Sequence, residues 1–206
     1  MSIALDLPTA PFAPWADIVR GDGPVTVEIL LDLPDDGYQY EVVEGVLVRM
    51  AGSGFDATTI AVALVAELHN YVRPRRLGRV TGADGVYKFP GAETSLAPDV
   101  GFLAAAKVAL LADRTKPILF APDLAVEVAS PDQTSETMAA KARTYLDGGT
   151  RLVWIVWPAG QQVDVWHAGR SVGPAAVLQA SDTLDGEDVV PGFSCLVASI
   201  FTDPLA

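Results

Sequence analysis

A single carboxylate inside an apolar run constrains this chain more than any other feature. The segment Leu124–Val128 is hydrophobic except for Glu127, and a β-strand points successive side chains to opposite faces. Glu127 would therefore share its face with two alanines, Ala125 and Ala129. Burying a charge without a partner is costly, and the alanines leave room beside the carboxylate. A metal ion is the simplest candidate for that partner.

A second carboxylate, Asp99, opens another apolar run at residues 100–103 and follows Pro98. The segment between Asp99 and Glu127 is long enough to connect two adjacent strands. Carboxylates at the ends of neighbouring strands form an oxygen-ligand site for a hard cation. Mg²⁺ is typically held by one or two carboxylates, with water and phosphate oxygens as its other ligands.

Length and composition bound the class of protein. The 206 residues, half of them hydrophobic, suit a single domain over residues 25–206, preceded by a proline-rich arm over residues 1–24. Cys195 is the only cysteine, which excludes an internal disulfide and a multi-cysteine zinc site. The amino terminus lacks a basic region, and no apolar run reaches the roughly 20 residues of a membrane span. We therefore expect a cytoplasmic protein without a membrane partner.

The charge balance weighs against casual binding of nucleic acid. The formal net charge is −12, whereas surfaces that bind DNA usually carry excess lysine and arginine. Four arginines nevertheless cluster within a short segment, at Arg73, Arg75, Arg76 and Arg79. Such a cluster at the end of a helix is most often a solvated surface that complements the helix dipole.

The order of the expected elements indicates an α/β or α+β domain with a mixed sheet. Residues 38–43 and 46–50 predict a β-hairpin around Glu44-Gly45. A long, largely buried helix should then begin with Asp56 as its cap, continue to about Tyr71 and end at Pro74. The remaining principal elements are expected at residues 79–89 (a broken strand), 100–103 and 124–128 (strands), 135–146 (helix), 152–157 and 162–167 (strands).

Several short motifs in a fixed order resemble a known family. They are residues 40–45 (Tyr-Glu-Val-Val-Glu-Gly), 97–100 (Ala-Pro-Asp-Val), 121–131 (Ala-Pro-Asp-Leu-Ala-Val-Glu-Val-Ala-Ser-Pro), 152–158 and 191–193. Lys141 and Tyr145 lie between the third and fourth of these motifs. Over about residues 25–203 the chain is similar to the Uma2 family, also called DUF820, within the PD-(D/E)XK nuclease superfamily. The resemblance implies a restriction endonuclease-like fold: a mixed β-sheet core flanked by helices, with an N-terminal hairpin and C-terminal strands.

The resemblance also implies roles for particular residues. Asp99, Glu127 and the backbone carbonyl of Val128 would bind Mg²⁺ or Mn²⁺ in an endonuclease that cleaves nucleic acid, with DNA favoured. The superfamily places a lysine two residues after the glutamate, where this chain has Ala129. Lys141, from the following helix, resembles the replacement and would orient the attacking water or stabilise charge. Glu41 is a further candidate, as a metal ligand or a structural residue.

Two other readings fit the same residues. One is a non-catalytic interaction or scaffold protein on this fold, and the other is a metal-dependent hydrolase of a small phosphoester. Surface charge around Asp99 and Glu127 discriminates between the nuclease and these alternatives, because a basic rim favours nucleic acid and an acidic one disfavours it. A homodimer is also expected, because the apolar arm and a late hairpin carrying Trp157 and Trp166 could form an exposed edge.

Overall fold

The computed structural model describes residues 9–10, 13–20, 25–33, 36–169 and 173–202. Its centre is a six-stranded sheet in which β9 and β10 are parallel and every other neighbouring pair is antiparallel. This mixed sheet, with helices on both faces, confirms the predicted fold class. In spatial order the strands are β12 (Ala176–Leu178), β11 (Gln162–His167), β10 (Leu152–Trp157), β9 (Leu124–Val128), β8 (Val100–Ala104) and β5 (Gly78–Gly82).

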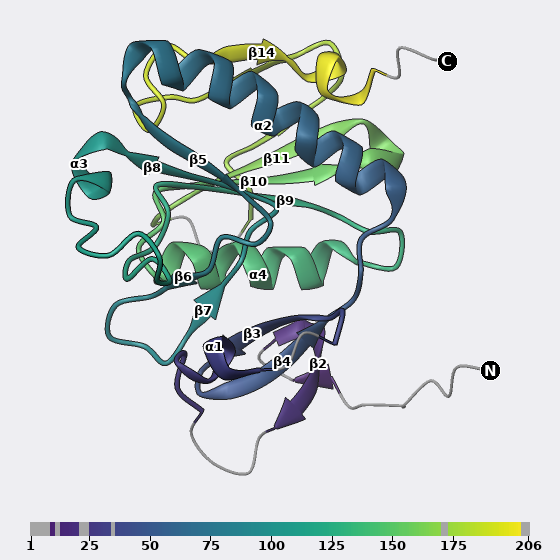
Figure 1. Ribbon diagram of the computed structural model, residues 1–206. Helices are drawn as coiled ribbons and strands as arrows, with labels where there is room; N and C mark the ends of the chain where they lie inside the picture. Colours follow the sequence, from purple (N-terminus) through teal and green to yellow (C-terminus); the bar gives the residue numbers. More distant parts are fainter. Residues whose placement is uncertain (1–8, 11–12, 21–24, 34–35, 170–172, 203–206) are drawn as a thin grey trace.

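Figure 1 shows the layers on either side of this central sheet. Helix α2 (Phe55–Arg75) covers one face, and α4 (Ser135–Asp147) covers the other. The short pair β13 (Thr183–Asp185) and β14 (Ser194–Leu196) lies on the side of α2. The remaining short helical turns are α1 (Ile29–Asp32), α3 (Ala105–Val108), η1 (Pro158–Gly160) and η2 (Val197–Phe201).

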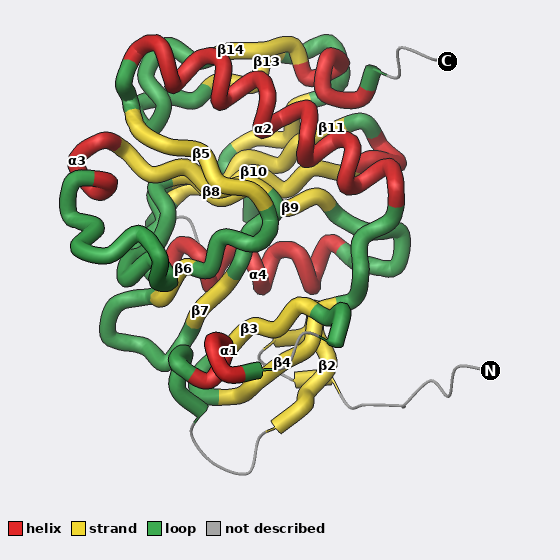
Figure 2. Tube along the Cα trace, in the orientation of Figure 1, coloured by secondary structure: helices red, strands yellow, loops and turns green. Residues whose placement is uncertain are grey.

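A second, smaller sheet lies beyond α4, and Figure 2 shows its strands apart from the central sheet. Its spatial order is β1 (Thr9–Ala10), β2 (Ala13–Arg20), β4 (Val46–Met50), β3 (Gln39–Val43), β7 (Ser95–Leu96) and β6 (Tyr87–Lys88). Strand β2 belongs to the segment expected to be an arm, and it pairs with β4 of the hairpin. The rest of residues 1–24, apart from β1, lies outside the described residues.

The predicted hairpin is confirmed as β3 and β4. Its turn residues Glu44 and Gly45 have φ values of 50° and 77°, and Val43 pairs directly with Val46. Two consecutive residues of positive φ form the tight hairpin turn whose twist matches that of the strands it joins. The same hairpin carries Glu41, which lies in the middle of β3 and is buried rather than part of a polar turn.

Three expectations for the long helix were wrong. Helix α2 begins at Phe55 after Gly54, so Asp56 lies in its first turn and does not cap it. It passes through Pro74 and ends at Arg75, and the next residue, Arg76, is left-handed and donates its backbone N–H to the carbonyl of Arg73. Only one stripe is buried, at Ala57, Ile60, Leu64, Leu68 and Val72. Beside that stripe, Ala61, Val65 and Tyr71 are partly buried against the core, whereas Phe55 and Val62 are exposed to solvent.

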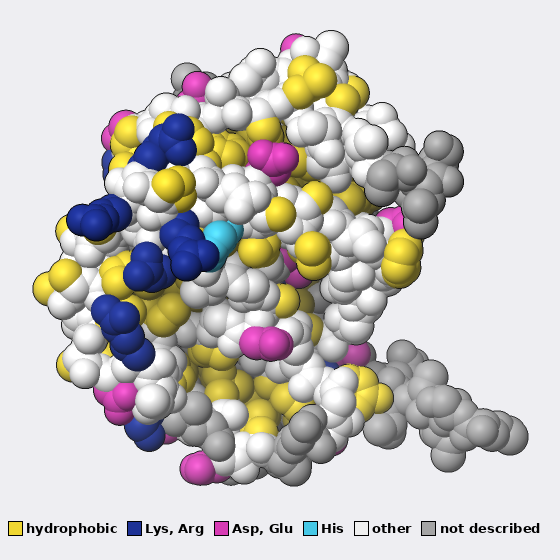
Figure 3. Space-filling view, turned by 45° about the horizontal axis from the view of Figure 1, so that its top comes forward, with side chains coloured by type: hydrophobic (Ala, Val, Ile, Leu, Met, Phe, Trp, Pro, Cys, Tyr) yellow, Lys and Arg dark blue, Asp and Glu magenta, His cyan; other side chains and the backbone are white. Residues whose placement is uncertain are grey.

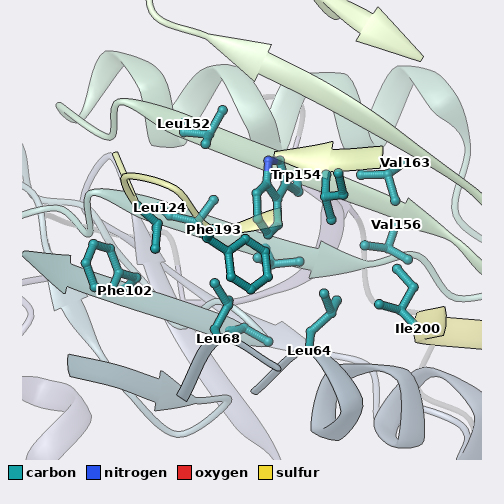
Figure 4. Packing of buried hydrophobic residues seen from close by; sticks show 14 of the residues in the cluster. Leu64, Leu68, Phe102, Leu124, Leu152, Trp154, Val156, Val163, Phe193 and Ile200 are labelled. Carbon is teal, nitrogen blue, oxygen red and sulfur yellow. The ribbon is translucent and has the colours of Figure 1, made fainter. Parts of the chain in front are cut away.

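The alternation predicted for Leu124–Val128 is confirmed. Its larger residues pack toward α2 in the main core, together with Leu64, Leu68, Trp154 and Phe193 (Figure 4). The opposite face packs toward α4, and its members are Ala125 and Ala129 of this strand region with Met138, Ala142 and Tyr145 of the helix. Each core leucine withdrawn from water contributes about 1.5–3 kcal/mol to folding, so the strand is fixed firmly from both sides.

The expected exposed edge at the late hairpin is not found. Trp166 is buried, and Trp157 donates its indole N–H to Asp164 at 2.8 Å. Strand β11, which carries Trp166, is covered by β12 rather than left unpaired. An isolated hairpin pattern cannot reveal a short later strand that completes the sheet. Among the described residues, no helix is both long enough and apolar enough to cross a membrane.

Candidate active site

The four residues predicted to be catalytic come from separate parts of the chain and line one cleft of about 70 Å³. Asp99 immediately precedes β8, Glu127 lies in β9, Lys141 lies in α4 and Glu41 lies in β3 of the smaller sheet. The cleft therefore lies where the two sheets and α4 meet. Its other lining residues are Trp15, Gln39, Met50, Ala51, Ser53, Ala97, Val128, Ser130, Asp132 and Gln133.

Glu127 is held by protein groups as well as facing the cleft. The phenolic O–H of Tyr145 donates to Oε1 of Glu127 at 2.6 Å, and Nζ of Lys141 lies 3.0 Å from the same oxygen. The room expected beside Ala125 and Ala129 is therefore filled by side chains of α4. This corrects the expectation that the small neighbours leave that space for an ion, and the cleft is the side from which an ion could reach the carboxylate.

Lys141 lies where the resemblance placed it, with its ammonium directed at carboxylates rather than solvent. Only 3% of its side chain is exposed, and Nζ is 3.0 Å from Glu127 and 3.7 Å from Oε1 of Glu41. Helical order explains this position, because α4 begins soon after β9 and packs back on the same face of the sheet. Lys141 and Tyr145 are one turn apart, so both reach Glu127.

Glu41 is the buried partner that holds the lysine from the other sheet. Its Oε1 accepts a hydrogen bond from the backbone N–H of Ala97 at 3.0 Å. Its Oε2 accepts from the indole N–H of Trp15 at 3.3 Å. A carboxylate whose two oxygens already receive donors is well compensated. This geometry favours a positioning role for Glu41 over metal binding.

Asp99 is tied directly to the strand that carries Glu127. Its Oδ2 accepts a hydrogen bond from the backbone N–H of Val128 at 2.7 Å. Burial raises the pKa of Asp99, while the Val128 N–H and the charge of Lys141 act in the opposite direction. The bond fixes the Asp99 carboxylate beside the residue that follows Glu127, and all three residues line the cleft.

The cleft carries more negative charge than its lysine can balance. Burial raises the pKa of Glu127 to about 8; Lys141 opposes this rise, whereas Asp99 and Glu41 add to it. The pKa of Lys141 is raised despite burial, because Glu127, Glu41 and Asp99 all favour its charged form. Burial, followed by the charge of Glu127, raises the pKa of Tyr145 well above its usual value, which keeps it a hydrogen-bond donor.

This donor set fits a hard divalent cation. The carboxyl groups of Asp99 and Glu127 line the cleft together with Val128, and the one lysine of the lining faces more than one acid. Within the described parts of the chain, no group of three or more His, Cys, Asp or Glu side chains is arranged to hold a metal ion. A cation here would thus rely on two carboxylates plus main-chain and water oxygens, a combination that suits Mg²⁺.

The surroundings of the cleft are not basic. Among its described lining residues, the acids are Glu41, Asp99, Glu127 and Asp132, and the one cation is the buried Lys141. The arginine cluster of residues 73–79 lies at the far end of α2, whereas Asp99 faces residues of its first half. Figure 3 shows Lys and Arg side chains gathered along one side of the molecule. Because an acidic surrounding repels phosphates, this lining disfavours close contact with a phosphate backbone.

Stability should depend on pH through Glu127. Its pKa is about 8 in the folded protein against an ordinary 4.5, so between these values the folded state binds more protons than the unfolded state. The free energy of unfolding contributed by this group is therefore expected to fall as pH rises from about 4.5 to about 8. Urea denaturation across that range should show the decline in the wild type and a flatter profile in Glu127→Gln.

Glu136→Gln is the matched control, since Glu136 is an exposed acid in the first turn of α4. Its pH profile should follow the wild type. If the Glu127→Gln profile declined as steeply as that of the wild type, Glu127 would not be the titrating group.

Two contacts of the site escaped sequence reasoning. Trp15 could not be connected with Glu41, because a proline-rich apolar segment gives no sign of which strand it will pair with. Tyr145, one turn from Lys141 on α4, donates its phenolic O–H to Glu127. The helical spacing contained this signal, since two residues on the same face of α4 can reach the same acceptor.

Comparisons with known proteins bear on the fold and the family. The family model Uma2, described as "Putative restriction endonuclease", matches residues 27–198. A crystal structure described as that of a "putative nuclease belonging to DUF820", from Anabaena variabilis ATCC 29413, is similar with a TM-score of 0.72 and 21% sequence identity. The alignment covers 86% of this chain and 98% of that one, so the two share a fold. No curated protein matches the chain.

Proposed function

Because the chain belongs to the Uma2 family, we propose that it is a Mg²⁺- or Mn²⁺-dependent endonuclease that hydrolyses phosphodiester bonds of nucleic acid, with DNA favoured. The observation that carries this proposal is the meeting of Asp99, Glu127 and Lys141 in one buried cleft. Perturbed carboxylates beside a buried ammonium in a cleft are the pattern expected of a catalytic site.

Asp99, Glu127 and the carbonyl of Val128 would hold the cation. When bound, the cation supplies a water of lowered pKa and polarises the phosphate oxygens. The hydrogen bond from the Val128 N–H keeps Asp99 in place, and the O–H of Tyr145 fixes the carboxylate of Glu127. The acids are therefore pre-organised before substrate arrives.

Lys141 would stabilise negative charge that develops on the phosphate during attack. Only 3% of its side chain is exposed, although it lines the cleft, and its pKa is raised, so it stays charged over the physiological range. Glu41 holds it from the opposite side, at 3.7 Å. A fixed positive charge in a water-poor site is worth far more than the same charge in water.

The direct test is a cleavage assay with purified protein and either Mg²⁺ or Mn²⁺. Single- and double-stranded DNA and RNA, both circular and linear, should be compared, with EDTA as the control. The proposal requires cleavage that depends on the added cation and disappears on chelation. Failure on every substrate under these conditions would favour a non-catalytic interaction protein on the same fold.

A second candidate is hydrolysis of a small phosphoester. It is favoured by the acidic lining of the cleft, because a small substrate does not bring a long row of phosphates past Asp132 and Glu41. The same assay with bis(p-nitrophenyl) phosphate separates the two. Release of nitrophenol together with intact nucleic acid would select the small-substrate reading.

The proposal includes a homodimer. Strand β12 is the terminal strand of the central sheet, and its Val177 is an exposed apolar residue. Unpaired edges are commonly covered by association, most often through a two-fold axis. Light scattering at micromolar concentration should give about twice the 21.7 kDa of one chain. A mass near that of one chain would contradict the dimer.

A further inference from the structure

A second hollow adjoins the cleft and is larger, with a volume of about 340 Å³. It lies between the hairpin, the first half of α2 and the end of β5. The two share a boundary formed by Gln39, Met50, Ala51, Ser53 and Asp99. A group bound in the hollow would therefore lie directly beside the proposed cation site. Ligand pockets in proteins begin at about 300 Å³, so the hollow can hold a ring system.

The lining of this hollow is apolar and almost free of charge. Met50, Ala61, Val62 and Val65 contribute hydrophobic side chains, and Gln39, Ser53 and Thr58 supply a few polar groups. Among its described lining residues there is no lysine or arginine, and the single charged residue is Asp99. These lining residues therefore offer a phosphate no positively charged side chain. An uncharged, flat ring with polar edges matches the lining better.

Tyr38 supplies an aromatic surface at this hollow. More than half of its side chain, 54%, is exposed, and it is among the lining residues. The guanidinium of Arg49 lies 4.5 Å from the centre of the Tyr38 ring and is paired with Asp17 at 3.4 Å. The backbone N–H of Tyr38 donates to Asp36 at 3.1 Å. Arg49 covers one face of the ring and is absent from the lining of the hollow, so a bound group would stack on the opposite face.

We propose that the hollow binds an unpaired nucleobase of the substrate, stacked on Tyr38, with the adjoining phosphate at Asp99 and Glu127. The inference rests on the proposed nuclease function and specifies its substrate class. Aromatic side chains bind bases of any sequence by stacking, and a base must leave a duplex before it can enter such a pocket. The preferred substrate is thus single-stranded nucleic acid, and a duplex is bound more weakly because unpairing costs free energy.

Binding can be measured separately from cleavage. A fluorescent single-stranded oligonucleotide and the matched duplex are titrated by anisotropy with Ca²⁺ present, and a gel verifies that the probe stays intact. We expect the wild type to bind the single strand more tightly. Tyr38→Ala should weaken that binding about 5- to 150-fold, the range expected for loss of one stacked base. Tyr38→Phe should retain it, and Leu110→Ala, at an exposed apolar residue outside the hollow, is the control.

A second pair of variants tests the hollow itself. Val62 is 67% exposed on α2, so Val62→Glu should fold, yet it places a negative charge in the lining. It should weaken single-strand binding as strongly as Tyr38→Ala. Asn70→Glu adds the same charge two turns further along the helix, outside the lining, and should not.

The outcomes separate this inference from the proposed function. Tight, Tyr38-dependent binding of single strands without any cation-dependent cleavage would support the base site and contradict the nuclease. Cation-dependent cleavage with duplex preferred, and with binding unchanged by Tyr38→Ala and Val62→Glu, would overturn the base site and leave the nuclease standing.

Discussion

Replacement of Glu127 by glutamine is expected to abolish cation-dependent cleavage while leaving the fold intact. Glutamine has the same shape and can still accept the hydrogen bond that Tyr145 donates to the carboxylate. It cannot supply the negative charge that a cation requires. We expect cleavage to fall by at least about 100-fold, the order of loss seen when one electrostatic element of a catalytic site is removed. A fixed-time cleavage assay under excess Mg²⁺ measures this directly.

Two controls make that result specific. Glu136→Gln removes an exposed carboxylate from the same helix that carries Lys141 and should cleave as the wild type does. Far-ultraviolet circular dichroism of Glu127→Gln should match the wild type, which excludes a trivial loss of fold. Activity within about threefold of the wild type would show that Glu127 is not a catalytic residue. It would also contradict the proposed function.

Replacement of Lys141 by methionine should damage both stability and activity. Methionine fills much the same volume, but it leaves Glu127 and Glu41 buried without the ammonium now 3.0 Å and 3.7 Å away. Breaking a buried ion pair by removing one partner typically costs about 3–5 kcal/mol. Urea denaturation should show a loss of this size at neutral pH, and cleavage should fall to the background.

The double variant Glu127→Gln with Lys141→Met distinguishes an ion-pair effect from poor packing. Removing both charges should restore a large part of the lost stability, because the uncompensated Glu127 carboxylate is gone. Lys116→Met, at an exposed position outside the cleft, should leave both quantities unchanged. Additive losses in the double variant would show that Lys141 contributes through packing rather than through its charge. If Lys141→Met cleaved nucleic acid as fast as the wild type, Lys141 would have no catalytic role.

The sequence predicted local elements and the strand that carries Glu127 well, because these depend on short-range rules. The alternation around Glu127 placed it on the face of the alanines, and the Glu44-Gly45 pair predicted the hairpin turn. The place of Lys141 followed from the order of β9 and α4 together with the family resemblance. In each case the relevant neighbours are close in sequence or in a fixed order along the chain.

What could not be predicted depends on contacts between distant segments. The apolar residues around α2 suggested a largely buried helix, but only one stripe of it is buried and Val62 is exposed. The pairing of β2 with β4, which brings Trp15 to Glu41, is set by neither propensity nor spacing. The space next to Ala125 and Ala129 was assigned to an ion, because the sequence could not show that Tyr145 would fill it.

The contacts of Glu41 also determine when in folding the site can be completed. Its partners Trp15 and Ala97 are 26 and 56 positions away along the chain, and Lys141 is farther still. Contacts between such distant segments form late, because long loops must close first. Until then the carboxylates and the lysine stay hydrated. The free energy of desolvating them is therefore spent when the two sheets dock. A chain that docked them out of register would bury these charges unpaired, so the charged residues of the candidate site also favour the correct pairing of the two sheets.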